Sequence, residues 1–155
     1  MAAVCVAESA AERLADVIAR VEPRLRAISE DLSLWRYGEG KWSKRELLGH
    51  LIDSASNNHQ RFVRAQQIDK LAFPSYNADP WVAVQRYHDA PWSNLLDLWL
   101  AYNRHLVHVM RAIPEDRLAM RCDIVGYGES SLGEIVVDYV DHIEHHMRQI
   151  LELMP

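Results

Sequence analysis

The sequence predicts an all-α fold, a four-helix bundle formed by one domain over residues 1–155. The first observation is a set of three Ser-x-x-Glu capping boxes, in which the serine and the glutamate satisfy the free backbone N–H groups of a helix start. They stand at Ser9–Glu12, Ser43–Glu46 and Ser131–Glu134. The second observation is an apolar stripe with helical spacing after each start. The third is a composition of 49% hydrophobic and 25% charged residues, which is typical of a chain that buries a core.

The first two helices are expected at about Ser9–Glu30 and Ser43–Ile68. Pro23 lies within the first of them. Because proline lacks a backbone N–H and its ring crowds the preceding turn, we expect the helix to kink or break there.

A long connection follows the second helix, and it contains a short helix of its own. An aspartate cap with proline at the first helical position, Asp79-Pro80, predicts a helix that continues to about Tyr87. A connection of this length favours a bundle with a crossover over a series of simple up-down hairpins.

The third and fourth long helices are expected at about Ser93–Ile113 and Ser131–Leu153. Pro91 and Pro114 bound the third helix on either side. The turn-rich segment 123–130 has room for a brief extended stretch. The chain offers too few strand-like segments for a sheet, so we expect none.

The charge of the chain excludes some classes of partner. A net charge of −5 gives no basic face for nucleic acid, and the basic stretch Lys41–Glu46 is short. No segment has the apolar length of a membrane span, and the N-terminal residues lack the features of a secretion signal. The two cysteines, Cys5 and Cys122, make no disulfide framework. We therefore expect a cytoplasmic protein that binds neither nucleic acid nor membranes.

Three histidines stand within five residues on the predicted fourth helix, in the stretch DYVDHIEHHMRQI (Asp138–Ile150). His142 and His146 lie about 40° apart around the helix, one turn from each other on its apolar side, whereas His145 lies toward the polar boundary. This spacing lets one helix present two ligands to a metal ion. The alternative is that each ring forms hydrogen bonds within the bundle, or that the pair is exposed to solvent.

The metal interpretation needs a third ligand from elsewhere in the chain. The fourth helix lacks the H-E-x-x-H motif of zinc proteases, since Ile143 follows the first histidine. On the second helix, His50 and His59 are both candidates for the third ligand.

Two motifs resemble those of the DinB/YfiT-like superfamily of metal-binding four-helix bundles. KWSKRELLGHLIDSASNNHQRF (Lys41–Phe62) resembles the family's W-S-x-x-E-x-L-x-H-L opening of the second helix. DYVDHIEHHMRQI resembles its H-x-x-x-H-x-x-Q-I ending on the last helix. With the matching order and length of the helices, the resemblance covers essentially the whole chain.

The resemblance implies a three-histidine site for a divalent metal ion, zinc or nickel, formed by His50, His142 and His146. His59 does not match the family motif, which favours His50 as the third ligand. A shell of three histidines leaves a position open to water or substrate, which is the pattern of catalytic sites. Neutral imidazoles suit both zinc and nickel.

A polar stripe extends along the second helix from His50. Asn57 and Arg61 lie close to its direction around the helix, and they are candidate substrate-binding residues. In one interpretation they line a channel, with Arg61 holding a carboxylate or phosphate. In the other the stripe is a solvated helix face.

Asp138 and Gln149 are candidates for orienting the metal ligands. Asp138 is one turn before His142, and Gln149 is three residues after His146, so either could hold the outer ring nitrogen of a histidine. Asp138 is equally compatible with an ordinary exposed position.

The function that the resemblance implies is that of a metal-dependent enzyme, either a transferase that acts on a low-molecular-weight thiol or a hydrolase. The sequence assigns no catalytic base. The alternatives are a non-catalytic metal-binding or stress-response bundle, and a metal-free bundle whose histidines form core hydrogen bonds. We also expect a small-molecule substrate and a homodimer.

Overall fold

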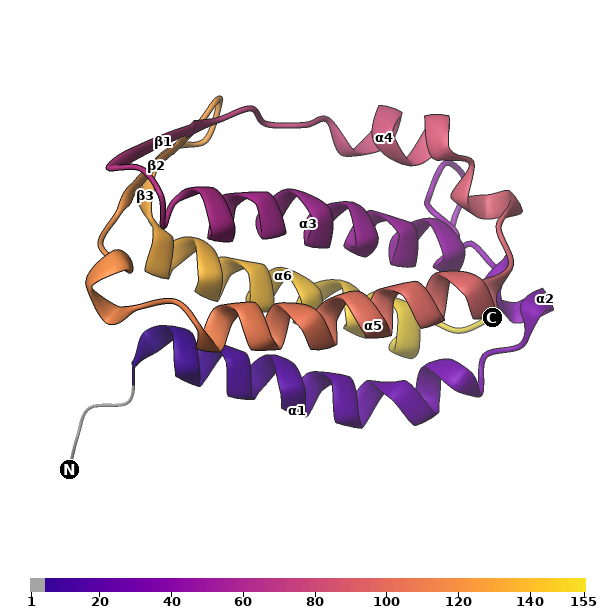
Figure 1. The fold of residues 1–155 in the computed structure, drawn as a ribbon. Coiled ribbons are helices and arrows are strands. Elements are labelled where there is room, and N and C mark those ends of the chain that lie inside the picture. Colours follow the sequence, from indigo (N-terminus) through magenta and orange to yellow (C-terminus); the bar gives the residue numbers. More distant parts are fainter. Residues whose placement is uncertain (1–4) are drawn as a thin grey trace.

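Four long helices pack side by side into one bundle (Figure 1), as the sequence predicts. The computed structural model describes residues 5–155. The long helices are α1 (Val6–Arg26), α3 (Lys44–Arg64), α5 (Trp92–Arg111) and α6 (Leu132–Glu152). Four short helical segments join them: α2 (Glu30–Ser33), α4 (Ala78–Gln85), η1 (Tyr87–Asp89) and η2 (Glu115–Arg117). None of the helices in residues 5–155 has the length and hydropathy needed to cross a membrane.

The predicted crossover is present in the connection between α3 and α5. Each of α1 and α3 packs against both α5 and α6. After α3 the chain returns along the outer side of this helix through α4 and η1, so that α5 starts at the same end of the bundle as α3 (Figure 1). As a result α3 and α5 run in the same direction, and α6 runs antiparallel to α3.

The core lies between the four long helices, which direct their apolar stripes toward one another. Leu14 of α1, Leu51 of α3, Trp99 of α5 and Ile143 of α6 are all 0% exposed. Burying each such side chain stabilises the fold by about 1.5–3 kcal/mol. This packing fixes α3 against α6, the two helices that carry the candidate metal ligands.

Two of the three predicted capping boxes are confirmed. Ser43 Oγ accepts a hydrogen bond from the backbone N–H of Glu46, and Ser131 Oγ accepts one from Glu134, while each glutamate accepts one from the backbone N–H of its serine. The box at Ser9 is wrong, since α1 begins at Val6 and Ser9 lies in its first turns. The apolar stripe of α1 begins earlier than the motif suggested, because Ala7 is already buried.

The first helix also ends differently from the prediction. Pro23 does not break α1, which continues to Arg26, because Val21 and Leu25 are buried on either side of the exposed proline. The helix then stops before Glu30, and Ser29 caps a separate segment, α2.

A small three-stranded sheet stands at the end of the bundle where α3 ends and α6 begins (Figure 1). It consists of β1 (Lys70–Phe73), β2 (Arg121–Ile124) and β3 (Gly128–Ser131), in that order. β1 pairs with β2 in parallel, and β2 with β3 as an antiparallel hairpin whose turn contains Gly126 at a φ of +88°. The expectation that the chain forms no sheet is therefore wrong. The second helix is also shorter than expected, ending at Arg64 so that the chain can enter β1.

The short helix α4 covers the outer side of α3. It starts at Ala78, after Asn77 and not after a capping Asp79. Behind it, the ring of Tyr87 lies directly on Gly49 of α3, where a Cβ atom would come within 2.2 Å of the ring. Because of this cover, polar residues on the outer side of α3, such as Asp53, are buried.

Candidate metal centre

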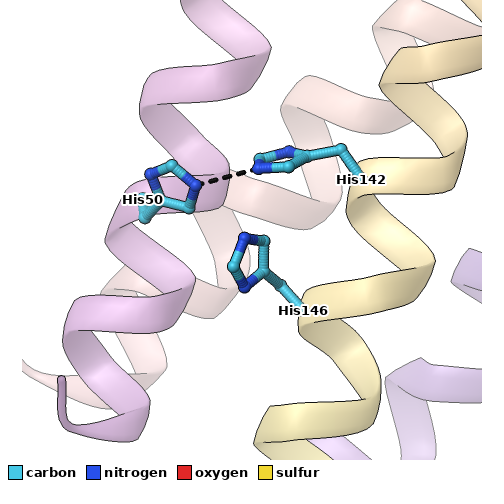
Figure 2. Close-up of side chains that lie close together, drawn as sticks. All are labelled: His50, His142 and His146. Carbon is cyan, nitrogen blue, oxygen red and sulfur yellow. Dashed lines mark hydrogen bonds between the residues drawn. The ribbon is translucent and has the colours of Figure 1, made fainter. Parts of the chain in front are cut away.

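Helices α3 and α6 bring three histidine rings together (Figure 2): His50 from α3, and His142 and His146 from successive turns of α6. One nitrogen of each ring lies within 4.8 Å of the corresponding nitrogens of the other two. The ring centroids are 4.6 to 4.9 Å apart. We call these three residues the triad. It joins positions that are 92 residues apart in the chain.

The outer nitrogens of the two α6 rings are held by other side chains. His146 Nδ1 lies 2.6 Å from Gln149 Oε1. An amide oxygen can only accept, so Nδ1 carries the proton and the lone pair of His146 is on Nε2. His142 Nδ1 lies 3.3 Å from Ser54 Oγ. Both contacts leave the Nε2 atoms directed into the triad, and Figure 2 shows the rings arranged in this way.

The rings of the triad are neutral at neutral pH. Burial, and after it the proximity of His142 and His146, lowers the pKa of His50 to about 3. Burial and the neighbouring His146 and His145 lower the pKa of His142 to about 4, and burial also lowers the pKa of His146. Metal ligation requires neutral imidazole, so the site keeps its ligands in the reactive form.

The donor set fits a divalent cation. His50 Nε2 and His142 Nε2 are 2.9 Å apart, so one proton at most lies between them. Since His146 Nε2 is also unprotonated, the buried centre gathers more lone pairs than protons, an arrangement that a cation between the rings would stabilise. The residues present therefore suit a divalent metal ion in number and type.

A cavity of about 690 Å³ adjoins the triad. His50 and His142 form part of its wall. Helix α3 contributes a row of further residues, Ser54, Asn58 and Arg61. Further lining residues come from α6 and from residues 75–78, and the β2–β3 hairpin contributes Ile124, Tyr127, Gly128 and Ser130. This volume is in the range of small-molecule sites.

Only one of the two predicted substrate-binding residues lies on the cavity wall. Arg61 lines the cavity, but Asn57 is not among the lining residues. The Asn57 amide donates to the backbone oxygen of Asp53 instead, at 2.9 Å. Asn58 stands on the cavity wall, because positions 50, 54, 58 and 61 share one side of α3. This stripe is not a solvated face, since Ser54 and Asn58 are only 3% and 7% exposed.

Of the two predicted orienting residues, Gln149 contacts the triad and Asp138 does not. Asp138 is exposed and lines the cavity, and Ser54 takes the place beside His142. Ser54 belongs to the polar stripe expected along the second helix, but its contact with His142 was not predicted. Sequence reasoning missed Trp42, whose ring lies 5.0 Å from that of His50 and covers it.

The remaining histidines lie outside the triad. His59 Nδ1 is 3.0 Å from the hydroxyl of Tyr102, and its ring is 5.3 Å from that of His105. His145 is exposed. Within the described chain the triad is the one group of at least three His, Cys, Asp or Glu residues whose donor atoms come together in this way.

Comparison with known families identifies the group to which this bundle is related. The sequence model of the DinB superfamily matches residues 13–150. The chain belongs to the DinB superfamily. This agrees with the motifs that contain His50, His142 and His146.

Two known proteins illustrate the similarity. YfiT from Bacillus subtilis, described as a probable metal-dependent hydrolase with an unusual four-helix bundle topology, matches with a TM-score of 0.85 and 21% sequence identity. The match covers 95% of this chain and 85% of YfiT, and it establishes the shared fold. A protein from Oceanobacillus iheyensis, provisionally named a metal-dependent hydrolase, is 27% identical over 114 residues. That alignment covers 74% of this chain and 65% of the relative, so the chain spans slightly less than two thirds of the relative's length.

Proposed function

We propose that the protein is a metal-dependent enzyme of the hydrolase type, in which His50, His142 and His146 hold one divalent ion, zinc or nickel. The observation that carries the proposal is the position of the triad, because two of its histidines form part of the wall of a small-molecule cavity. A structural zinc site is usually closed by four protein ligands, and in the described chain only three donors come together here. The names of the two relatives support the same class of activity.

In this proposal, different residues orient the metal ligands, cover them and bind the substrate. When bound, the ion supplies a Lewis acid that lowers the pKa of water and keeps a position for a substrate group. Ser54 and Gln149 hold the rings of His142 and His146 in the required orientation. Trp42 covers the ring of His50. The cavity binds the small molecule next to the triad.

A second candidate is transfer to or from a low-molecular-weight thiol. Three neutral imidazoles do not compensate the charge of a divalent ion, and this favours an anionic ligand such as a thiolate in the remaining position. The two candidates predict different products. The first consumes water, and the second consumes a thiol together with an electrophile.

Metal analysis of the purified, untagged protein tests the centre. We expect about one zinc or nickel ion per chain, and none in a His50→Ala/His142→Ala/His146→Ala triple variant, since three histidines are a complete protein shell for a catalytic ion. His145→Ala is the matched control, because His145 is the exposed neighbour of His146 on the same helix. A wild type that takes up no metal even after reconstitution would leave a bundle whose histidines serve the core.

Turnover assays of the loaded protein then separate enzyme from non-catalytic metal protein. Ester and amide hydrolysis is measured beside conjugation of a thiol with an electrophile. An enzyme loses turnover in His146→Ala while the variant remains folded. A structural site would instead show a closed shell, no turnover, and a large loss of stability on chelation.

A further inference from the structure

Arg61 is a partly buried cation on the cavity wall, and no residue within 5–155 is its anionic partner. Among residues 5–155 it forms no ion pair, and its buried Nε atom has no hydrogen-bond acceptor. Its single hydrogen bond is a long one, 3.4 Å from Nη1 to Asn58 Oδ1, and its guanidinium lies 5.4 Å from the ring centre of Phe73. Asp138, the one carboxylate of the cavity lining, does not pair with it.

Arg45 and Lys44, which are buried cations as well, both have close polar partners. Arg45 pairs with Glu30 and also donates to Ser33 and to the backbone of His88. Lys44 donates to two backbone oxygens at the end of α6. An unpaired buried charge costs free energy, and burial accordingly lowers the pKa of Arg61. Among the described residues, Arg61 is therefore a cation that the fold leaves without an anionic partner.

The position of Arg61 near the end of α3 does not explain its inward direction. A cation there stabilises the helix dipole from the surface equally well. Arg64 does so, since it is exposed and donates to Gln60 at 2.9 Å. Arg64 therefore already stabilises the dipole at the end of α3, and this role does not account for the position of Arg61 on the cavity wall.

The cavity lining also contains neutral side chains that can form hydrogen bonds. Ser75, Tyr76 and Ser130 line it together with Arg61. Burial raises the pKa of Tyr76 to about 12, so its hydroxyl stays protonated and can donate. A guanidinium and several hydroxyl groups in one cavity are chemistry that binds a carboxylate or phosphate group.

We propose that Arg61 binds the anionic end, a carboxylate or a phosphate, of the small molecule whose other end reaches the triad. This deepens the proposed function and rests on it for the identity of the reacting end. Arg61 follows His50 by 11 residues, which corresponds to a rise of about 16 Å along α3. The ligand is therefore an elongated molecule with one terminal anion.

Calorimetric titration with octanoate, octyl phosphate and 1-octanol tests the anion site. We expect both anions to bind the wild type at least about tenfold more tightly than they bind Arg61→Met, as the loss of a charged hydrogen-bonding partner predicts. Arg64→Met is the matched control, and it should bind as the wild type does. 1-Octanol should bind all three proteins alike. Comparison of the two anions shows which head group is preferred, and equal anion affinity in Arg61→Met overturns the proposal.

Two further measurements separate anion binding at Arg61 from metal binding at the triad. Anion binding should persist in the triple-histidine variant. If it is lost there and kept in Arg61→Met, the anion binds at the triad and the proposal is wrong. Arg61→Met should keep the wild-type metal content, since the two sites are separate. A wild-type protein that binds the anions but takes up no metal would contradict the proposed function without contradicting the anion site.

Thermal denaturation distinguishes a binding role from a structural one. Without ligand, Arg61→Met should melt at or above the wild-type temperature, because the substitution removes a partly buried charge that has no anionic partner in residues 5–155. A clearly lower melting temperature would show that Arg61 supports the fold, and it would overturn the proposal.

Discussion

At the scale of single residues, the triad depends on the partners of its outer nitrogens. Gln149→Leu removes the oxygen that fixes the Nδ1 proton of His146. We expect metal affinity to fall by about 10- to 100-fold, the usual effect of losing such a partner. Competition with a chelator measures it, and Gln149→Glu should retain most of the affinity because it keeps an acceptor. Unchanged affinity in Gln149→Leu would show that the contact does not orient the ring.

Gly49 is a second residue whose lack of a side chain is critical, because the ring of Tyr87 leaves no room for a Cβ atom. Its Cβ position lies 2.2 Å from two ring atoms of Tyr87, so Gly49→Ala forces α4 and η1 away from α3. We expect a loss of about 1–3 kcal/mol in the free energy of unfolding, measured by urea denaturation. Gly133→Ala is the matched control, another buried helical glycine whose added Cβ would come no closer than 3.4 Å to any neighbour. Equal stability of the two variants would contradict the close packing at Tyr87.

The triad itself could be predicted from residue spacing and motifs. His142 and His146 share one side of a helix by their spacing alone, and the motif around His50 supplied the third ring. The contact of Ser54 with His142 was harder to foresee, because it depends on how two helices distant in sequence face each other. Spacing gives the direction of a side chain around its own helix, and it does not give the facing partner.

At the scale of the elements, Lys44 links the start of α3 to the end of α6. Its ammonium is buried and donates to the backbone oxygens of Ile150 and Leu153. Lys44→Met leaves these oxygens without donors, so we expect unfolding to become easier by about 1–3 kcal/mol. Hydrogen exchange in the last turn of α6 should accelerate. Lys41→Met, at an exposed lysine, is the control, and a Lys44→Met variant as stable as this control would contradict the capping role.

The long helices could be predicted and the strands could not, for a physical reason. Each long helix repeats its apolar stripe over five or more turns, so the pattern is strong within the helix itself. Strand β1 has four residues, and its partner is β2, with Lys70 opposite Arg121. Four residues contain too little alternation to identify a strand, and pairing across such a distance is set by the packed bundle.

At the scale of the whole molecule, stability should depend on pH through the triad. His50 and His142 have folded-state pKa values of about 3 and 4, below the ordinary 6.5. Between these values the unfolded chain binds protons that the folded chain excludes. The metal-free protein should therefore lose stability as the pH falls from about 6.5 to 4, by up to about 1 kcal/mol per pH unit for each histidine.

Urea denaturation across this pH range, after removal of metal, measures the effect. The triple-histidine variant is the control, and its profile should be flatter because it lacks the groups that titrate differently in the two states. Parallel profiles for the wild type and the triple variant would show that the three histidines do not determine the acid response.

The 92-residue separation between His50 and His142 has a consequence for the dynamics of the bundle. An ion held by the triad would act as a reversible cross-link that closes a long loop of chain between α3 and α6. The entropy of loop closure grows with length, so such a link restricts the unfolded chain considerably. It would also suppress partial opening in which α6 separates from α3, because the ligands come from both helices. Loading with metal should thus convert a motion of one helix into an event that requires the whole bundle to open.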